Sequence, residues 1–260
     1  MNSTPMSNNM IAKKCANLLH FYDEILQINE IITSIPQNKK NYTFQSKKEI
    51  IHIEPIVDHV KLIPVKVLNP AQNIDELKKQ LLQFKENSFE KSETTFVFGD
   101  GNPNADLLIL GDAPSFDDVQ LGKPFMGIVG QLLDRMLGFI SVTRAHCFMS
   151  NVTFWHKPQN HQFSAQEIED VIHFVHQMIK LINPKIIVTL GATATNALLN
   201  KPQGITQLRG KFHPYPMNPD IMILPSFHPS SLLTSPQNKQ LSWRDLLLLK
   251  SKIFEMESSK

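Results

Sequence analysis

Three residues able to take part in chemistry each follow a short apolar segment of the sequence: Asp112, Asn151 and His228. A carboxylate such as that of Asp112 positions or polarises water, and the carboxamide of Asn151 has a donor at one end and an acceptor at the other. The imidazole of His228 is a donor that stabilises negative charge as it forms. Because short apolar runs are typical of buried strands, we expect all three residues to meet at one edge of a sheet.

The elements that position these residues are predicted from the spacing of the apolar side chains. Continuous apolar runs predict strands buried on both faces, and segments with helical spacing lie between them. The clearest helix spans 165–182, where Ser164 and Glu167 form a capping box. Strands that alternate with helices predict a three-layer α/β/α fold around a central four-stranded parallel sheet. The predicted strands are 105–110, 146–152, 185–190 and 221–227, and the other helices are 73–84, 131–140 and 243–256.

Residues 1–72 are predicted to form an N-terminal helical extension, separate from a domain over residues 73–260. Apolar residues at helical spacing predict an accessory helix over 10–32, which Pro36 ends. Residues 37–70 mix lysine pairs, prolines and short apolar pieces without regular periodicity, and so indicate a linker. Lysine pairs in a linker are usually solvated, and we favour this over contact with a phosphate backbone.

Composition narrows the class of protein. Among 260 residues, 26 Lys and Arg stand against 24 Asp and Glu, a formal net charge of +2, so a nucleic-acid partner must be held by a local patch. The two cysteines, Cys15 and Cys147, exclude a disulfide framework and a four-thiolate metal site built from this chain alone. Without a secretory signal or an apolar run near the ~20 residues of a membrane span, a cytoplasmic protein is expected.

Several motifs occur in a fixed order between about Leu77 and Leu248. They are GDAPS at 111–115, GKPFMG at 122–127, GQLLDR at 130–135, SN at 150–151, LRGKFH at 208–213 and FHPSSLL at 227–233. In this order the sequence resembles the family-4 branch of the uracil-DNA glycosylase superfamily. The resemblance implies an enzyme of base excision repair that flips uracil out of DNA, hydrolyses its N-glycosidic bond and leaves an abasic site.

The resemblance also implies roles for individual residues. Asn151 would distinguish uracil from cytosine, Phe125 would stack on the base, and His228 would stabilise negative charge at O2. Asp112 would place the attacking water, in a uracil-binding loop that also contains Gly111, Ala113 and Ser115. The implied DNA contacts are Leu232, as a wedge that enters the base stack, and the phosphate-binding residues Ser230, Arg209 and Lys211.

Structural alternatives stay open for several of these residues. An Asn in a loop usually satisfies backbone groups, and a Phe or Leu is usually part of a core. Arg209 and Lys211 are equally compatible with ordinary surface charges. Asp112 stands where most relatives have Glu and Ser115 where they have Gly, which leaves the water geometry and the exclusion of thymine open. Two neighbouring features are given no catalytic role: Asp117-Asp118, interpreted as solvated or helix-capping, and Gly99-Asp100-Gly101, interpreted as a turn.

Many members of the family hold an iron–sulfur cluster, and the cysteines that would bind it are missing here. Trp155 and His156 stand in place of the cysteine of a KCRPP-like segment, and residues 85–93 contain none. We therefore expect no cluster, no metal and no other cofactor, and a colourless protein. Local packing around Trp155 would replace the stapling role of the cluster.

Two other functions fit the same residues. The pocket would bind uracil or damaged DNA with little turnover if the departures at Asp112 and Ser115 impair catalysis. Alternatively, the domain would be a non-enzymatic interaction module whose partner site is the N-terminal extension. We favour the enzyme, acting as a monomer on uracil-containing DNA, with no membrane and no obligate protein partner.

Overall fold

Six strands form one sheet in the order β1-β3-β2-β4-β6-β5. The computed structural model describes residues 70–88, 96–157 and 163–258. The four central strands run parallel and are β3 (Phe148–Asn151), β2 (Leu107–Gly111), β4 (Ile186–Leu190) and β6 (Asn218–Ser226). They coincide with the four apolar segments of the sequence, so the α/β class and the parallel arrangement are confirmed.

The two edge strands were not expected. β1 (Gly99–Gly101) pairs antiparallel with β3, and β5 (His213–Tyr215) pairs antiparallel with β6. The sheet therefore has six strands rather than four, and the interpretation of 99–101 as a turn is wrong. Each of these strands has three residues, which is too short for an alternating pattern to be recognised.

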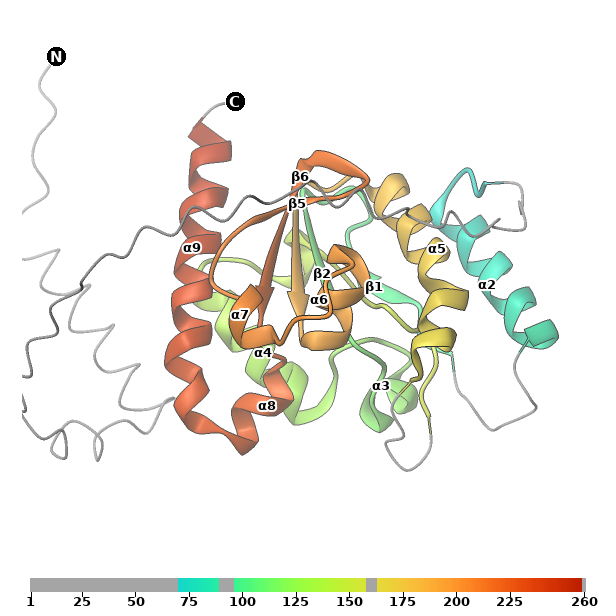
Figure 1. Ribbon diagram of the computed structural model, residues 1–260, viewed down its shortest axis with the longest axis horizontal. Helices are drawn as coiled ribbons and strands as arrows, with labels where there is room; N and C mark the ends of the chain where they lie inside the picture. Colours follow the sequence, from blue (N-terminus) through green and yellow to red (C-terminus); the bar gives the residue numbers. More distant parts are fainter. Residues whose placement is uncertain (1–69, 89–95, 158–162, 259–260) are drawn as a thin grey trace, which may run out of the picture. The chain divides into compact units, whose positions relative to one another are not determined.

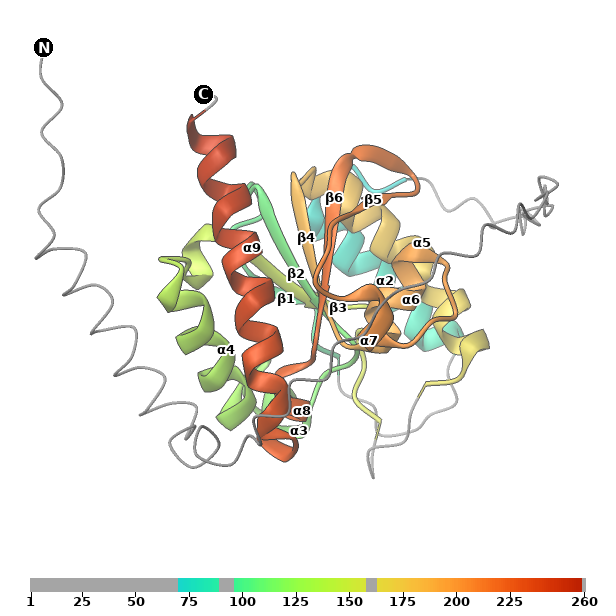
Figure 2. The same cartoon turned by 60° about the vertical axis from the view of Figure 1, so that its left-hand side comes forward.

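Helices cover both faces of the sheet and complete the three layers (Figures 1 and 2). α2 (Ile74–Ser88) and α5 (Ala165–Ile182) lie side by side over one face, whereas α4 (Gly127–Phe139) and α9 (Lys239–Ser258) lie over the other. α5 has the predicted bounds, while α4 and α9 begin earlier than predicted. Their first turns carry few core residues, so the apolar pattern does not mark where they start.

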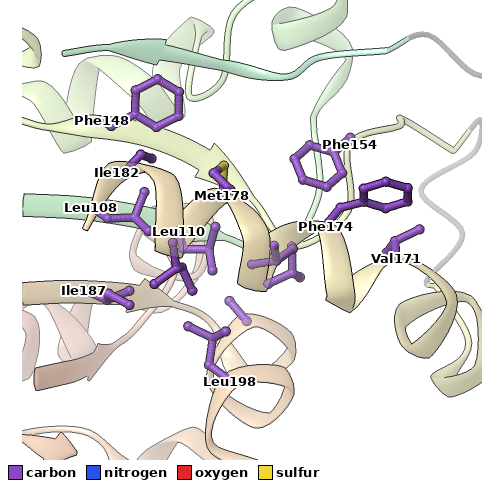
Figure 3. Close-up of a cluster of buried hydrophobic side chains, with 14 of the residues drawn as sticks. Leu108, Leu110, Phe148, Phe154, Val171, Phe174, Met178, Ile182, Ile187 and Leu198 are labelled. Carbon is purple, nitrogen blue, oxygen red and sulfur yellow. The ribbon is translucent and has the colours of Figure 1, made fainter. Parts of the chain in front are cut away.

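The core between the sheet and α5 follows the apolar stripe of that helix, as Figure 3 shows. The helix begins at the predicted capping box of Ser164 and Glu167. Leu108 and Leu110 of β2 belong to this core, whereas the intervening Ile109 is buried on the opposite face of the sheet. The central strands are thus buried on both sides, as their continuous apolar runs predict. Core residues of α5 include Val171, Phe174, Met178 and Ile182.

Short helices gather at the carboxyl ends of the parallel strands. They are α3 (Phe116–Leu121), α6 (Ala192–Leu199), α7 (Ile205–Leu208) and α8 (Pro229–Thr234). In Figure 1, α3 and α8 lie at the lower end of the sheet, toward which the strand arrows point. This edge therefore holds the loops in which the sequence predicts the functional residues.

The N-terminal extension is predicted as a helix over 10–32 and a linker, which lie outside the described residues up to residue 69. The chain divides into two units, Met1–Lys66 and Val67–Lys260, and all described residues belong to the second. Within the described ranges, no helix combines the length and apolar character needed to cross a membrane.

Candidate active site

A cavity of about 760 Å³ opens at the carboxyl edge of the parallel strands. Of the residues nominated from the sequence, those that line it are Asp112, Ala113, Ser115, Phe125, His228 and Ser230. The nominated residues outside its lining are Gly111, Asn151, Leu232, Arg209 and Lys211. The cavity thus joins the loop after β2, the turn before α4 and the segment after β6.

Gly111 brings Asn151 and Phe125 together directly beside the cavity. A Cβ atom added to Gly111 would lie 2.5 Å from Asn151 Oδ1 and 2.7 Å from Phe125 Cζ, so a larger residue does not fit there. Asn151 is only 1% exposed, and its Nδ2 atom has no hydrogen-bond partner among the described residues. A buried amide donor without a partner costs free energy, which is commonly recovered when a ligand accepts from it.

Asp118 connects the loop after β2 to the turn that carries Phe125. Its carboxylate accepts the Ser115 N–H at 2.8 Å and the Met126 N–H at 2.6 Å. Ser115 is the N-cap of α3, with ordinary extended backbone angles, so this position does not require the glycine of relatives. The interpretation of the acidic pair as solvated or helix-capping is confirmed, because Asp117 is exposed and Asp118, which is only 4% exposed, caps α3.

His228 is held as a neutral donor. Its Nδ1 atom accepts the Ser230 N–H at 3.3 Å and lies 2.7 Å from the Ser230 Oγ. Because Nδ1 accepts from an amide, the ring proton of the neutral imidazole lies on Nε2. Burial lowers the pKa of His228 to about 4, so the ring is uncharged at neutral pH. Its ring centroid lies 6.1 Å from that of Phe125.

Ser230, for which a phosphate contact is predicted, contacts the His228 ring in this structure. Its amide donates to the His228 ring, and its hydroxyl lies within hydrogen-bond distance of the same Nδ1 atom. In this structure both groups lie against the His228 ring. Ser230 instead fixes the tautomer and the orientation of His228.

Asp112 lies at the N-terminus of α6. Its Oδ1 atom accepts the Ala194 N–H at 2.7 Å, and Gly191 allows the close approach because a Cβ there would lie 2.3 Å from Oδ2. Burial raises the pKa of Asp112 to about 6, although the Ala194 and Thr193 backbone donors act in the opposite direction. The carboxylate is thus present at neutral pH and is close to its titration range.

Two residues that support the loop after β2 were missed from the sequence. The Thr153 backbone N–H and hydroxyl both donate to the Asp112 carbonyl, and His156 Nδ1 lies 2.9 Å from the Pro114 carbonyl. Both come from the segment after β3, and His156 also lines the cavity. The sequence carries no signal for these contacts because they depend on how two loops meet in space.

Leu232, the wedge that the resemblance implies, does not lie in an exposed loop. Leu232 is fully buried within α8, whereas the next residue, Leu233, is 39% exposed. Pro229 supplies a favourable first helical residue, so the chain turns into a helix directly after His228. Leu232 lies on the face of this helix that packs inward. In this conformation its side chain cannot enter the base stack as a wedge.

Arg209, for which a phosphate contact is predicted, forms an ion pair within the fold. Its Nε atom donates to Asp245 Oδ2 at 3.1 Å, and its side chain is only 11% exposed. It also lies over the Phe227 ring, with 5.3 Å between the guanidinium carbon and the ring centroid. Arg209 therefore joins α9 to the segment after α7. Lys211, by contrast, is exposed but lies outside the cavity lining.

Replacing Arg209 with alanine is expected to destabilise the fold by about 3–5 kcal/mol, because Asp245 would keep a buried charge without its partner. Thermal unfolding measures this loss. The exposed Lys211 provides the matched control, and Lys211→Ala should leave the unfolding temperature nearly unchanged. Equal stability of the two variants would contradict the structural role of Arg209.

The described residues do not fit an iron–sulfur cluster. Trp155 is 2% exposed and packs against aromatic rings, with ring-centroid distances of 5.8 Å to Phe96 and 5.9 Å to Phe154. Cys147 is buried in the core, where desolvation raises the pKa of its thiol to about 12. Among the described residues, no group of three or more His, Cys, Asp or Glu side chains is arranged to hold a metal ion.

Comparison with known proteins identifies the family. Residues 98–248 match the family model of the uracil DNA glycosylase superfamily. A type-4 uracil-DNA glycosylase of Thermotoga maritima is 32% identical over 149 residues, which cover 57% of this chain and 77% of that protein. One from Sulfurisphaera tokodaii is 28% identical over 179 residues, which cover 66% of this chain and 81% of that protein. The matched segment contains the parallel strands and every residue that lines the cavity, and this chain belongs to the uracil DNA glycosylase superfamily.

Proposed function

We propose that this protein is a monofunctional uracil-DNA glycosylase that acts as a monomer and requires no metal or other cofactor. The observation that carries the proposal is the Asn151 Nδ2 atom, which has no partner in the described part of the chain. It is buried beside Gly111 and Phe125, next to a cavity lined by His228 and Asp112. The names of the type-4 relatives support the same activity. A cytoplasmic location fits a chain with two cysteines and a DNA substrate.

Recognition of the base rests on Asn151 and Phe125. The Asn151 Nδ2 atom would donate to uracil O4, and its Oδ1 atom would accept from N3–H, whereas cytosine presents an amino group and a bare N3 at the same places. The Phe125 ring would stack on the base. Because Asn151 is 1% exposed, a base reaches it only after covering side chains shift. Phe125 contacts Gly111 and also lines the cavity, so we assign the shift to its ring.

Bond cleavage rests on His228 and Asp112. The N1–C1′ bond breaks with its electron pair moving onto the base, and the His228 Nε2–H would stabilise the resulting negative charge at O2. Water then adds to C1′, and its proton ends on the departing uracil. Two backbone donors leave acceptor positions free on the Asp112 carboxylate, which would orient that water.

A uracil-containing oligonucleotide tests the proposal directly. Incubation followed by alkali should cleave the strand at the uracil, and the same strand with cytosine or thymine should stay intact. Uracil strands that stay intact would contradict the proposed glycosylase activity. A mobility shift on those strands would then favour a binding protein with little turnover, and the absence of any shift would favour an interaction module.

The pH dependence of the rate should report the ionisation of Asp112. Its pKa of about 6 predicts that the single-turnover rate rises toward pH 6 and levels above it, because only the carboxylate accepts from the water. At pH 5 about one tenth of the molecules carry the carboxylate, so the rate should fall about tenfold from its plateau. Asp112→Asn should give a slow enzyme without this acid limb.

The pH dependence of the free energy of unfolding is distinguishable from the pH dependence of the excision rate. The pKa of Asp112 is raised from 3.8 in an exposed chain to about 6 in the fold, so the folded state binds more protons between these values. The contribution of Asp112 to the free energy of unfolding therefore decreases as pH rises through this window, which is opposite to the rate. An acid limb that persists in Asp112→Asn would show that another group titrates.

A further inference from the structure

Arg144 reaches the backbone of the turn that carries Phe125. It lies in a short 3-10 helix (Arg144–His146) just before β3, on a different part of the chain from the turn. Its Nη1 atom donates to the Pro124 carbonyl at 3.1 Å, and its Nη2 atom donates to the Phe125 carbonyl at 2.5 Å. One guanidinium thus binds two successive carbonyls of the turn.

The turn needs such support because Phe125 has a left-handed backbone conformation, with φ at +55°. This conformation costs on the order of 1 kcal/mol or more for a residue with a side chain. The Phe125 carbonyl also faces Gly130, where an added Cβ would lie 1.8 Å from the oxygen. On the far side of the same peptide, Asp118 accepts the Met126 N–H at 2.6 Å. The Phe125–Met126 peptide is therefore held at both its oxygen and its nitrogen.

Two carboxylates orient the guanidinium. Arg144 Nε donates to Asp134 Oδ1 of α4 at 3.0 Å, and Nη1 lies 3.4 Å from Asp100 Oδ2 of β1. The Arg144 side chain is 23% exposed. A lysine would keep the positive charge near both carboxylates, but a single ammonium lacks the planar fork that serves several acceptors in fixed directions.

We propose that Arg144 is a positioning residue for the reaction: by fixing the two carbonyls of the turn, it sets the plane in which the Phe125 ring meets the base. This inference rests on the proposed excision of uracil and adds a residue that touches neither base nor sugar. When the fork is lost, excision should slow because the Phe125 ring is misplaced against the base, and not because the groups at the scissile bond or the fold are lost.

A double-mutant cycle tests the proposal. Arg144→Lys should lower the single-turnover rate of uracil excision about 10- to 100-fold, the range expected when a stacking group is displaced by about 1 Å. In a Phe125→Ala background the same change should alter the rate by less than about threefold, because the ring through which Arg144 acts is gone. Binding of a uracil oligonucleotide relative to the thymine strand should show the same non-additivity.

Controls separate positioning from stability. Lys185→Gln removes an exposed ion pair with Asp106, 3.4 Å long, at the opposite end of the strands, and should leave the rate unchanged. Asp134→Asn should reproduce part of the Arg144→Lys defect without touching the carbonyl contacts. Additive effects of Arg144→Lys and Phe125→Ala, with wild-type protein fully active, would overturn the positioning role. Wild-type protein that neither cleaves nor selectively binds uracil strands would overturn both this inference and the proposed function.

Discussion

Replacing His228 with alanine is expected to lower the single-turnover rate of uracil release about 10²–10³-fold, the loss typical of removing one donor aimed at developing charge. His228 has the properties that this role needs. Burial lowers its pKa to about 4, so the ring is neutral, and the Ser230 amide at Nδ1 fixes the proton on Nε2. Binding of uracil DNA should change far less than the rate, because the charge forms only in the transition state.

The neighbouring Ser230 gives a graded control for this prediction. Ser230→Ala removes the hydroxyl but keeps the backbone N–H to Nδ1, so the tautomer is retained and the rate should fall only a few fold. Rapid-quench measurements with enzyme in excess over the oligonucleotide isolate the chemical step. An excision rate in His228→Ala close to that of the wild type would contradict the catalytic role of His228.

Replacing Asn151 with alanine should have a comparable effect for a different reason. The variant loses the donor to O4 and the acceptor for N3–H, and about 2–4 kcal/mol of interaction with the flipped base goes with them. Excision should therefore slow by about 30- to 10³-fold. Because Nδ2 has no partner among the described residues, Asn151→Ala should not lower the thermal stability as a buried hydrogen-bond loss would.

Asn151→Asp sharpens the test. A carboxylate accepts but does not donate, so it should repel uracil O4 and accept from the amino group of cytosine. The ratio of uracil to cytosine cleavage, measured on otherwise identical strands, should fall in this variant. Asn218, at the far end of β6, offers the matched control: Asn218→Ala should leave both rate and ratio unchanged. An unaltered ratio in Asn151→Asp would show that the amide does not read the base.

The parallel sheet and its long helices were predictable because their signals are local. A strand buried on both faces must be apolar throughout, as in β2 and β4, and a surface helix must repeat its apolar residues every three or four positions, as in α5. The edge strands β1 and β5 carry neither signal. Their three residues form a sheet only because a longer neighbour is already in place.

The candidate site was predicted less completely, because its geometry depends on distant segments. Arg209 pairs with a carboxylate 36 residues further along the chain, and nothing beside it in the sequence indicates that partner. For Leu232 the sequence leaves an exposed wedge and a core residue at the start of a helix nearly equal, and the structure has the second, with a helix that starts at Pro229. Arg144 and Thr153 act on backbone carbonyls, which every residue has, so no residue type marks the places they reach.

The edge strands also bear on how this protein behaves when it is crowded. An exposed strand edge is a template onto which a strand of another molecule can add, and long flat edges favour aggregation. Here each edge strand is only three residues long, and β5 contains Pro214, which lacks an N–H group. In β1, the side chain of Asp100 forms ion pairs with Lys123 and Arg144, which places charge at that edge. The described edges of the sheet therefore offer few backbone groups onto which a strand of another molecule could add.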